Sequence, residues 1–211
     1  MAGRSDELAL LADAVRLRLD AANGAREKGL SACRRTIQAA SRSIRAVHRL
    51  QFDEAAEIAA QAGASLRDAQ DALAPFPSLA ASGPLHDAAK EYVEARLTLA
   101  LAAGRTLASA EELGVPDASW LNGLAEAASE LRRHLLDRLR AGEFSQAEQL
   151  LAAMDDVYAL LVTVDYPDAL TGGLRRTTDA LRPVLERTRG DLTTTFLQQR
   201  LQRAIEGRLP E

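Results

Sequence analysis

The stretch from Ser5 to Arg49 contains no proline and consists largely of alanine, leucine and charged residues. It predicts one long helix, with bends expected only at Asn23-Gly24 or Gly29, because glycine is the one strong helix breaker present. Apolar residues recur within it at alternating steps of three and four, the spacing of a packed helical seam: Leu30, Cys33, Ile37, Ala40, Ile44 and Val47. Such a helix is typical of an all-helical bundle.

The rest of the chain predicts further helices separated by proline and glycine. We expect them over residues 52–74, 84–103, 116–141 and 143–164, and from Asp168 or Leu174 past Arg200, with a short turn capped by Ser109. Pro183 is expected to kink the last helix. No fixed-period repeat and no long linker divides the chain. The predicted fold is therefore all-α, a single domain over residues 1–211 built as a bundle of about six to seven antiparallel helices.

Composition supports this class and limits the location of the protein. Aromatic residues make up only 4% of the 211 residues, which argues against a sheet protein. The single cysteine, Cys33, excludes an internal disulfide framework and a multi-cysteine zinc site, and we expect it to be buried. No segment approaches the roughly 18 apolar residues of a membrane span, and the N-terminal segment carries acidic residues. We expect a cytoplasmic protein that does not associate with membranes.

A basic stripe runs beside the apolar seam of the first helix. It falls within about 100° of arc at 100° per residue and consists of Lys28, Ser31, Arg35, Gln38, Arg42, Arg45 and Arg49. The net charge of −4 argues against nonspecific duplex binding over the whole surface but allows a local basic surface. From spacing alone, the stripe is either a solvated, salt-bridged face or a nucleic-acid-binding surface.

Several carboxylates share helix faces. Steps of four, three and four align residues of the helix at 84–103: Asp87, Glu91, Glu94 and Thr98. Glu126 and Glu130 align in the next helix, and Asp155 borders an apolar stripe. A carboxylate beside a core costs free energy unless it is protonated, paired or metal-bound. Converging carboxylates suit a hard cation such as Mg²⁺, which can activate water for attack at phosphorus, although a solvated acidic face is the plainer interpretation.

Other common sites are absent from the sequence. The three histidines, His48, His86 and His134, never form the Glu-x-x-His motif that a ferritin-like di-iron bundle needs twice. The chain contains no Gly-rich phosphate loop and no Gly-x-Ser-x-Gly elbow.

Four ordered segments resemble the translin/trax family. The segment RRTIQAASRSIRAVHRLQF (34–52) is similar to its basic first helix, and KEYVEA (90–95) to its Gln-Glu-Tyr-Val-Glu-Ala motif. WLNGLAEAASELR (120–132) resembles Tyr-Leu-Leu-Gly-x-Ala-Asp-Leu-Thr-Gly-Glu-Leu, and residues 165–193 resemble the C-terminal helix of prokaryotic members. The similarity covers roughly residues 30–195.

This resemblance implies a seven-helix fold, binding of RNA or single-stranded DNA, and closed oligomeric shells, commonly octamers. Trax-type members cleave RNA with metal-supported carboxylates, whereas translin-type members bind without them. Carried over by position, the two catalytic glutamates fall on Glu91 and Glu94. The catalytic aspartate falls on Asp155 when Phe144 is the anchor, and the adjacent Asp156 remains an alternative.

One departure concerns the third segment. Glu126 replaces the family's aspartate, and its extra methylene moves the carboxyl group by more than a bond length, so the sequence assigns it no direct role. The final glutamate of the motif survives as Glu130, which the resemblance makes a fourth metal ligand or a neighbour of the ligands.

The leading hypothesis is a Mg²⁺-dependent endoribonuclease, with Mn²⁺ as an alternative cofactor, that acts on single-stranded or short RNA inside a homo-oligomeric, octameric shell. Glu91, Glu94 and Asp155 would be catalytic and would bind the metal together with Glu130. Phosphates would be bound by Lys28, Arg35, Arg42, Arg45 and Arg49. The alternatives are a non-catalytic translin-like protein that binds single-stranded RNA or DNA, and a helical bundle for protein interaction.

Overall fold

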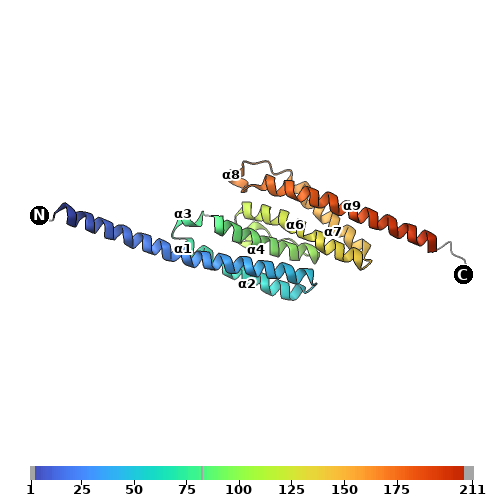
Figure 1. Ribbon diagram of the computed structural model, residues 1–211, viewed down its shortest axis with the longest axis horizontal. Helices are drawn as coiled ribbons and strands as arrows, with labels where there is room; N and C mark the ends of the chain where they lie inside the picture. The colour runs from blue at the N-terminus through green and yellow to red at the C-terminus, as the bar shows by residue number, and fades with distance from the viewer. Residues whose placement is uncertain (1–2, 82, 207–211) are drawn as a thin grey trace.

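The computed structural model describes residues 3–81 and 83–206, which contain helices and no strands (Figure 1). The long helices are α1 (Arg4–His48), α2 (Phe52–Leu73), α4 (Gly83–Ala102), α6 (Asp117–Arg140), α7 (Phe144–Leu161) and α9 (Leu174–Glu206). Three helices are single turns: α3 (Pro77–Ala80), α5 (Ala110–Leu113) and α8 (Asp168–Thr171). The predicted all-α fold is confirmed.

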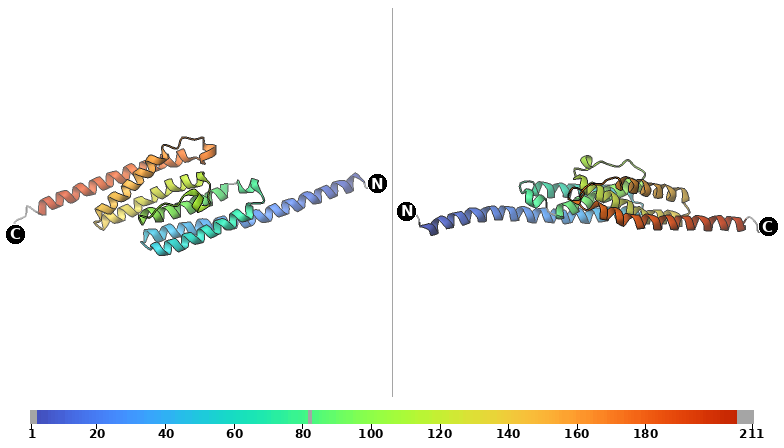
Figure 2. Two further views of the ribbon diagram at one scale, coloured as in Figure 1. Left: turned by 180° about the vertical axis from the view of Figure 1, so that it is seen from behind. Right: turned by 90° about the horizontal axis from the view of Figure 1, so that it is seen from above.

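Helix α4 lies at the centre of the bundle. The α1–α2 hairpin packs on one side of it, and α6 packs on the other side, backed by α7 and α9 (Figures 1 and 2). Most of its circumference is apolar, which suits a helix that is covered all round. Val93 and Leu97 of α4 are completely buried in one cluster with Leu124 of α6. The core of the molecule therefore passes through α4, and its few polar side chains lie near that core.

The helix ends follow the sequence signals closely, with two differences. As predicted, α1 is one long helix through Asn23-Gly24 and Gly29, and the last helix continues through Pro183. The segment after α2, expected to be loop, contains α3, which begins at Pro77 because proline suits the first helical turn. The last helix is divided into α8 and α9 at Gly172 and Gly173, whose positive φ angles of 60° and 83° suit glycine.

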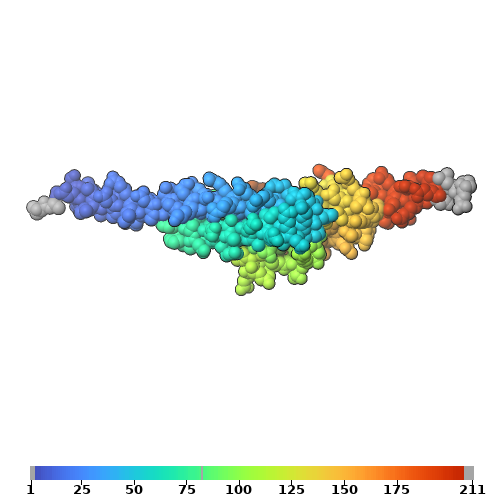
Figure 3. Space-filling view, turned by 90° about the horizontal axis from the view of Figure 1, so that it is seen from below, coloured from blue at the N-terminus to red at the C-terminus, as the bar shows by residue number. Residues whose placement is uncertain are grey.

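Two helices extend beyond the body of the molecule at opposite ends. The N-terminal half of α1 and the C-terminal part of α9 project away from the other helices (Figures 1 and 3). Both projections carry exposed large apolar side chains: Leu8, Leu10, Leu11, Val15, Leu17 and Leu19 on α1, and Phe196, Leu197, Leu201 and Ile205 on α9. These side chains have no cover within one subunit.

None of the helices that the structure describes is both long and apolar enough to cross a lipid bilayer.

Gly123 allows α6 to approach the backbone of α4 closely. A Cβ atom at this position would lie 2.7 Å from the Cβ of Val93 and 2.8 Å from the carbonyl oxygen of Lys90. Neither atom can move without shifting α4 itself. The separation of the two helices at this level is therefore set by the absence of a side chain.

We predict that Gly123→Ala destabilises the protein by about 1–3 kcal/mol, because the added methyl group overpacks the contact with α4. The matched control is Gly190→Ala, at an exposed position of α9 where a Cβ would meet nothing within 4 Å. That variant should gain up to about 1 kcal/mol from helix propensity. Denaturant unfolding of both variants measures the difference, and equal effects would show that the α4–α6 contact is not tight.

Candidate functional site

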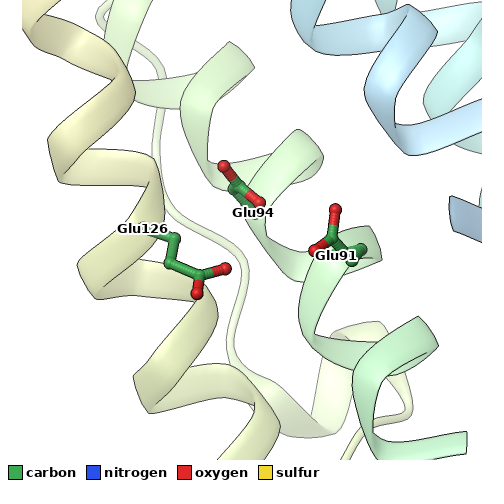
Figure 4. A group of neighbouring side chains, drawn as sticks. All are labelled: Glu91, Glu94 and Glu126. Atoms are coloured by element: carbon green, nitrogen blue, oxygen red, sulfur yellow. The ribbon is translucent and has the colours of Figure 1, made fainter. Parts of the chain in front are cut away.

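Three glutamates meet where α4 faces α6. Glu91 and Glu94 lie one turn apart on α4, and Glu126 points toward them from α6 (Figure 4). One carboxylate oxygen from each residue lies within 4.8 Å of the other two. Glu126 follows Gly123 by three residues, so the close helix contact described above positions it one turn further along α6.

The cluster holds more negative charge than its surroundings compensate. Glu94 is only 9% exposed, and burial, together with the charges of Glu91 and Glu126, raises its pKa to about 8. The pKa of Glu91 is also raised, mainly by burial, although the charge of Lys90 lowers it. At neutral pH, Glu94 therefore holds a proton for much of the time.

Lys90 supplies a positive charge beside the cluster. Its Nζ atom donates a 2.7 Å hydrogen bond to Glu126 and lies 3.9 Å from an oxygen of Glu91. Burial alone would lower the pKa of Lys90, but the hydrogen bond and charge of Glu126, with the charges of Glu91 and Glu94, raise it above its usual value. One ammonium group thus partly balances three carboxyl groups.

A hollow of about 250 Å³ opens beside the two α4 glutamates. His48, at the end of α1, lines it and donates from Nε2 to Glu130 across a distance of 2.8 Å. The charged side chains that line this acidic hollow come from three helices: Arg45, Glu91, Glu94, Glu130 and Arg133. Glu130 therefore lies beside the cluster, as its charge effect on the pKa of Glu94 also indicates.

The structure does not bring Asp155 to Glu91 and Glu94. Asp155 accepts a 2.5 Å hydrogen bond from Arg189 of α9, and it is absent from the lining of the acidic hollow. The adjacent Asp156 is exposed. The physical reason is that the apolar stripe of α7, which includes Met154, packs on α6 and α9, so the flanking acid faces α9 and not α4.

The carboxylate that joins the two α4 glutamates is Glu126, to which the sequence assigned no direct role. Its position in the third segment that resembles the family, where the family has an acidic residue, could have indicated a place in the cluster. Side-chain length alone did not predict this position, because the reach of Glu126 toward α4 also depends on the separation of the two helices, which Gly123 allows to be small.

The basic stripe of α1 is exposed along its whole length. Arg35 is already engaged, since it forms a 3.0 Å ion pair with Asp68 of α2. Arg45 donates to the neutral Ser41 hydroxyl, and Arg49 donates to Gln51. Among the described residues, Lys28 and Arg42 form no side-chain ion pair. Much of the positive charge of the stripe is therefore available to an anion.

The chemistry of the cluster suits a hard divalent cation. All three donors are carboxylate oxygens, which Mg²⁺ and Mn²⁺ prefer. The ion pair of Lys90 with Glu126 shows that the site attracts positive charge. The raised pKa of Glu94 shows that one ammonium group does not neutralise the negative charge of the cluster. The residues present therefore fit such an ion.

Comparison of the sequence with models of known protein families finds no match. The uncharacterised protein MJ0175 of Methanocaldococcus jannaschii is 32% identical over 129 residues, which are 61% of this chain and 56% of that protein. The match therefore spans about half the length of this curated relative.

Solved structures match over more of the chain. The crystal structure of AfC3PO is 31% identical, with a TM-score of 0.80 over 89% of this chain and 97% of that one. A structure of an AfC3PO–duplex RNA complex has 30% identity and the same TM-score and coverage. Apo-NeC3PO has a TM-score of 0.78 over 87% of this chain and 96% of that one, and at 18% identity it shows a shared fold.

The raised pKa of Glu94 predicts a pH-dependent stability of the metal-free protein. Its carboxyl group loses its proton near pH 4.5 when unfolded and near pH 8 when folded. Stability should therefore be fully present below pH 4.5 and fall as the pH rises to about 8. At 1.36 kcal/mol per pKa unit, the loss is about 5 kcal/mol at most.

Denaturant unfolding in EDTA at pH 5 and pH 8 measures this loss, and Glu94→Gln should remove most of it. The control is Glu57→Gln, which changes an exposed glutamate of α2 and should keep the wild-type pH dependence. An unchanged pH dependence in Glu94→Gln would contradict the assignment of buried charge to this residue.

Proposed function

Since the chain belongs to the translin/trax family, we propose that it is a divalent-metal-dependent endoribonuclease that acts on single-stranded or short RNA. The observation that carries the proposal is the group of Glu91, Glu94 and Glu126, three carboxylates from two helices within 4.8 Å of one another. Such a group is costly to the fold without a cation. It is therefore more readily explained by a metal-dependent reaction than by helix packing.

In this proposal, Glu91, Glu94 and Glu126 would hold Mg²⁺ or Mn²⁺. A bound divalent cation would supply a Lewis acid that promotes attack of water on the phosphodiester and neutralises charge on the phosphate oxygens. Glu94 would give up its proton on metal binding. His48 would orient Glu130 at the edge of the site through their 2.8 Å hydrogen bond, because this bond holds a carboxylate that is otherwise partly exposed.

The substrate class is supported by the surface around the cluster and by the comparison. Arg45 belongs to the basic stripe and also lines the acidic hollow, so an RNA bound along α1 would reach the glutamates. AfC3PO has been solved in complex with duplex RNA. We therefore propose RNA as the ligand, with single-stranded DNA as a second ligand to test.

A non-catalytic RNA-binding protein is the alternative, and one contact favours it. The 2.7 Å ion pair between Lys90 and Glu126 neutralises the carboxylate that completes the cluster. If this pair persisted in the presence of metal, the acids would only tie α4 to α6. The cleavage experiment below separates the two functions.

Assembly is part of the proposal. Large apolar side chains on both projecting helices, such as Leu17 at 73% exposure and Leu201 at 63%, have no cover within one subunit. Apolar surface of this extent favours symmetric self-association. We therefore propose a homo-oligomer, and the family resemblance suggests a closed shell of eight subunits.

The nuclease proposal predicts that Glu91→Gln, Glu94→Gln and Glu126→Gln each reduce Mg²⁺-dependent cleavage of a labelled RNA by at least about a hundredfold. Groups that hold one ion act as a unit, so single losses should approach the loss in the triple variant. Cleavage assays should include single-stranded and duplex RNA, each with Mg²⁺, Mn²⁺ or EDTA. RNA affinity should be retained.

Asp155→Asn is the matched comparison, since it removes an acidic group that pairs with Arg189 outside the cluster. Cleavage within about threefold of wild type is expected, because a partly exposed ion pair contributes little to stability. Loss of cleavage in Asp155→Asn, with Glu126→Gln active, would instead favour the aspartate assignment from sequence. RNA binding without cleavage by the wild-type protein would favour the non-catalytic alternative.

The assembly proposal predicts a light-scattering mass well above the 22.7 kDa of one subunit, and eight times that value for the shell. Leu17→Glu and Leu201→Glu should each lower the mass, because a charge is poorly tolerated in an apolar interface. Gln198→Glu changes an exposed polar residue on the same part of α9 and is the control. A 22.7 kDa species that still cleaves RNA would show that assembly is not required.

A further inference from the structure

Two larger grooves share lining residues with the acidic hollow. The groove between α1 and α2, of about 710 Å³, shares Ser41 and Arg45 with the hollow. The groove along α6, of about 530 Å³, shares Glu130 and Arg133 with it. The three depressions are therefore neighbours that extend from α1 past Glu91 and Glu94 to α6.

The α6 groove carries positive charge that the basic stripe of α1 does not include. Arg133 and Arg140 lie seven residues apart on α6, which corresponds to about 10.5 Å along a helix that rises 1.5 Å per residue. Both side chains are exposed. Such a spacing places two guanidinium groups along one side of the groove.

Neither of these two arginines has a close partner in the part of the chain that the structure describes. Among the described residues, Arg133 makes no ion pair and no side-chain hydrogen bond, and Arg140 has only a 3.8 Å contact with Asp137. Arg132, by contrast, is held by Asp191 and Thr188. Arg133 and Arg140 line the groove together with Arg132 and the acids Glu130 and Asp137. Arg133 and Arg140 therefore supply its more available positive charge.

We propose that the α6 groove is a second RNA-binding track, in which Arg133 and Arg140 bind phosphates of the strand after it crosses the acidic hollow. This inference rests on the proposed function and extends it beyond α1. Arg45 and Arg133 then flank the glutamates from α1 and α6, and each lines the hollow.

The charge of the hollow gives the physical reason for a cation on both sides. Glu91, Glu94 and Glu130 all line it, and a phosphodiester that approaches them is repelled unless nearby cations offset the repulsion. A cation on one side alone would bind the RNA on that side of the hollow but would not hold the next nucleotides over the carboxylates. Arg133 acts as a positioning residue that holds the strand across the carboxylates.

The test measures the binding of fluorescein-labelled oligouridylate by anisotropy in EDTA over a series of salt concentrations. Arg133→Ala and Arg140→Ala should each reduce the slope of log affinity against log salt by about 0.7, the value for one lost phosphate contact on a single strand. Arg133→Lys should restore the slope, because it restores the charge. Exposed substitutions of this kind change stability by about 0.5 kcal/mol or less, so the variants should fold.

Arg105→Ala is the matched control, since Arg105 is exposed and lines none of the three depressions. Cleavage with Mg²⁺ supplies a second readout. Arg133→Ala should lower kcat by at least about tenfold because the strand is no longer held over the glutamates, whereas Arg140→Ala should raise KM and leave kcat nearly unchanged.

The outcomes separate this inference from the proposed function. Wild-type cleavage combined with slopes for Arg133→Ala and Arg140→Ala equal to that of Arg105→Ala would overturn the second track and leave the nuclease intact. Reduced slopes in a protein that does not cleave would support the track and overturn the nuclease. Absence of RNA binding by the wild-type protein would overturn both.

Discussion

The close contact between α4 and α6 at Gly123 is the constraint on which the candidate site depends. A Cβ atom at this position would lie less than 3 Å from Val93 and from the carbonyl oxygen of Lys90. The two helices can therefore pack this closely only because residue 123 has no side chain. This approach lets Glu126 reach the α4 glutamates, and it also lets the Lys90 ammonium reach Glu126. A wider separation would leave two separate acidic faces.

The site concentrates like charges beside the buried core of the molecule. Glu94 lies on α4, beside the completely buried Val93 and Ala95, and its pKa is raised to about 8 because burial and neighbouring carboxylates both oppose its ionisation. Asp155 shows the contrasting arrangement, in which an acid nearer the surface has its own arginine. Conflict between stability and local chemistry is expected at functional sites, where stability is given up for reactivity.

The distribution of charge explains how an acidic protein could present a basic surface to the RNA that we propose as its ligand. The net charge of −4 describes the whole chain, whereas the arginines of α1 and α6 lie along neighbouring depressions. The local electrostatic potential depends on the nearest charges, because salt largely screens charges that lie more than about 8–10 Å away. The acids outside these depressions would therefore have little effect on an RNA strand bound there as proposed.

The sequence by itself determined the long helices, the basic stripe and the pairing of Glu91 with Glu94, because each depends on the helical repeat within one segment. It also pointed to the family through short ordered segments. It did not determine that Glu126, rather than Asp155, joins that pair, nor that Arg45 and Arg133 line the same hollow. Those relations depend on which helix faces which and at what separation. Only tertiary packing decides this, since α7 packs on the side of α6 away from the cluster while Gly123 draws α6 against α4.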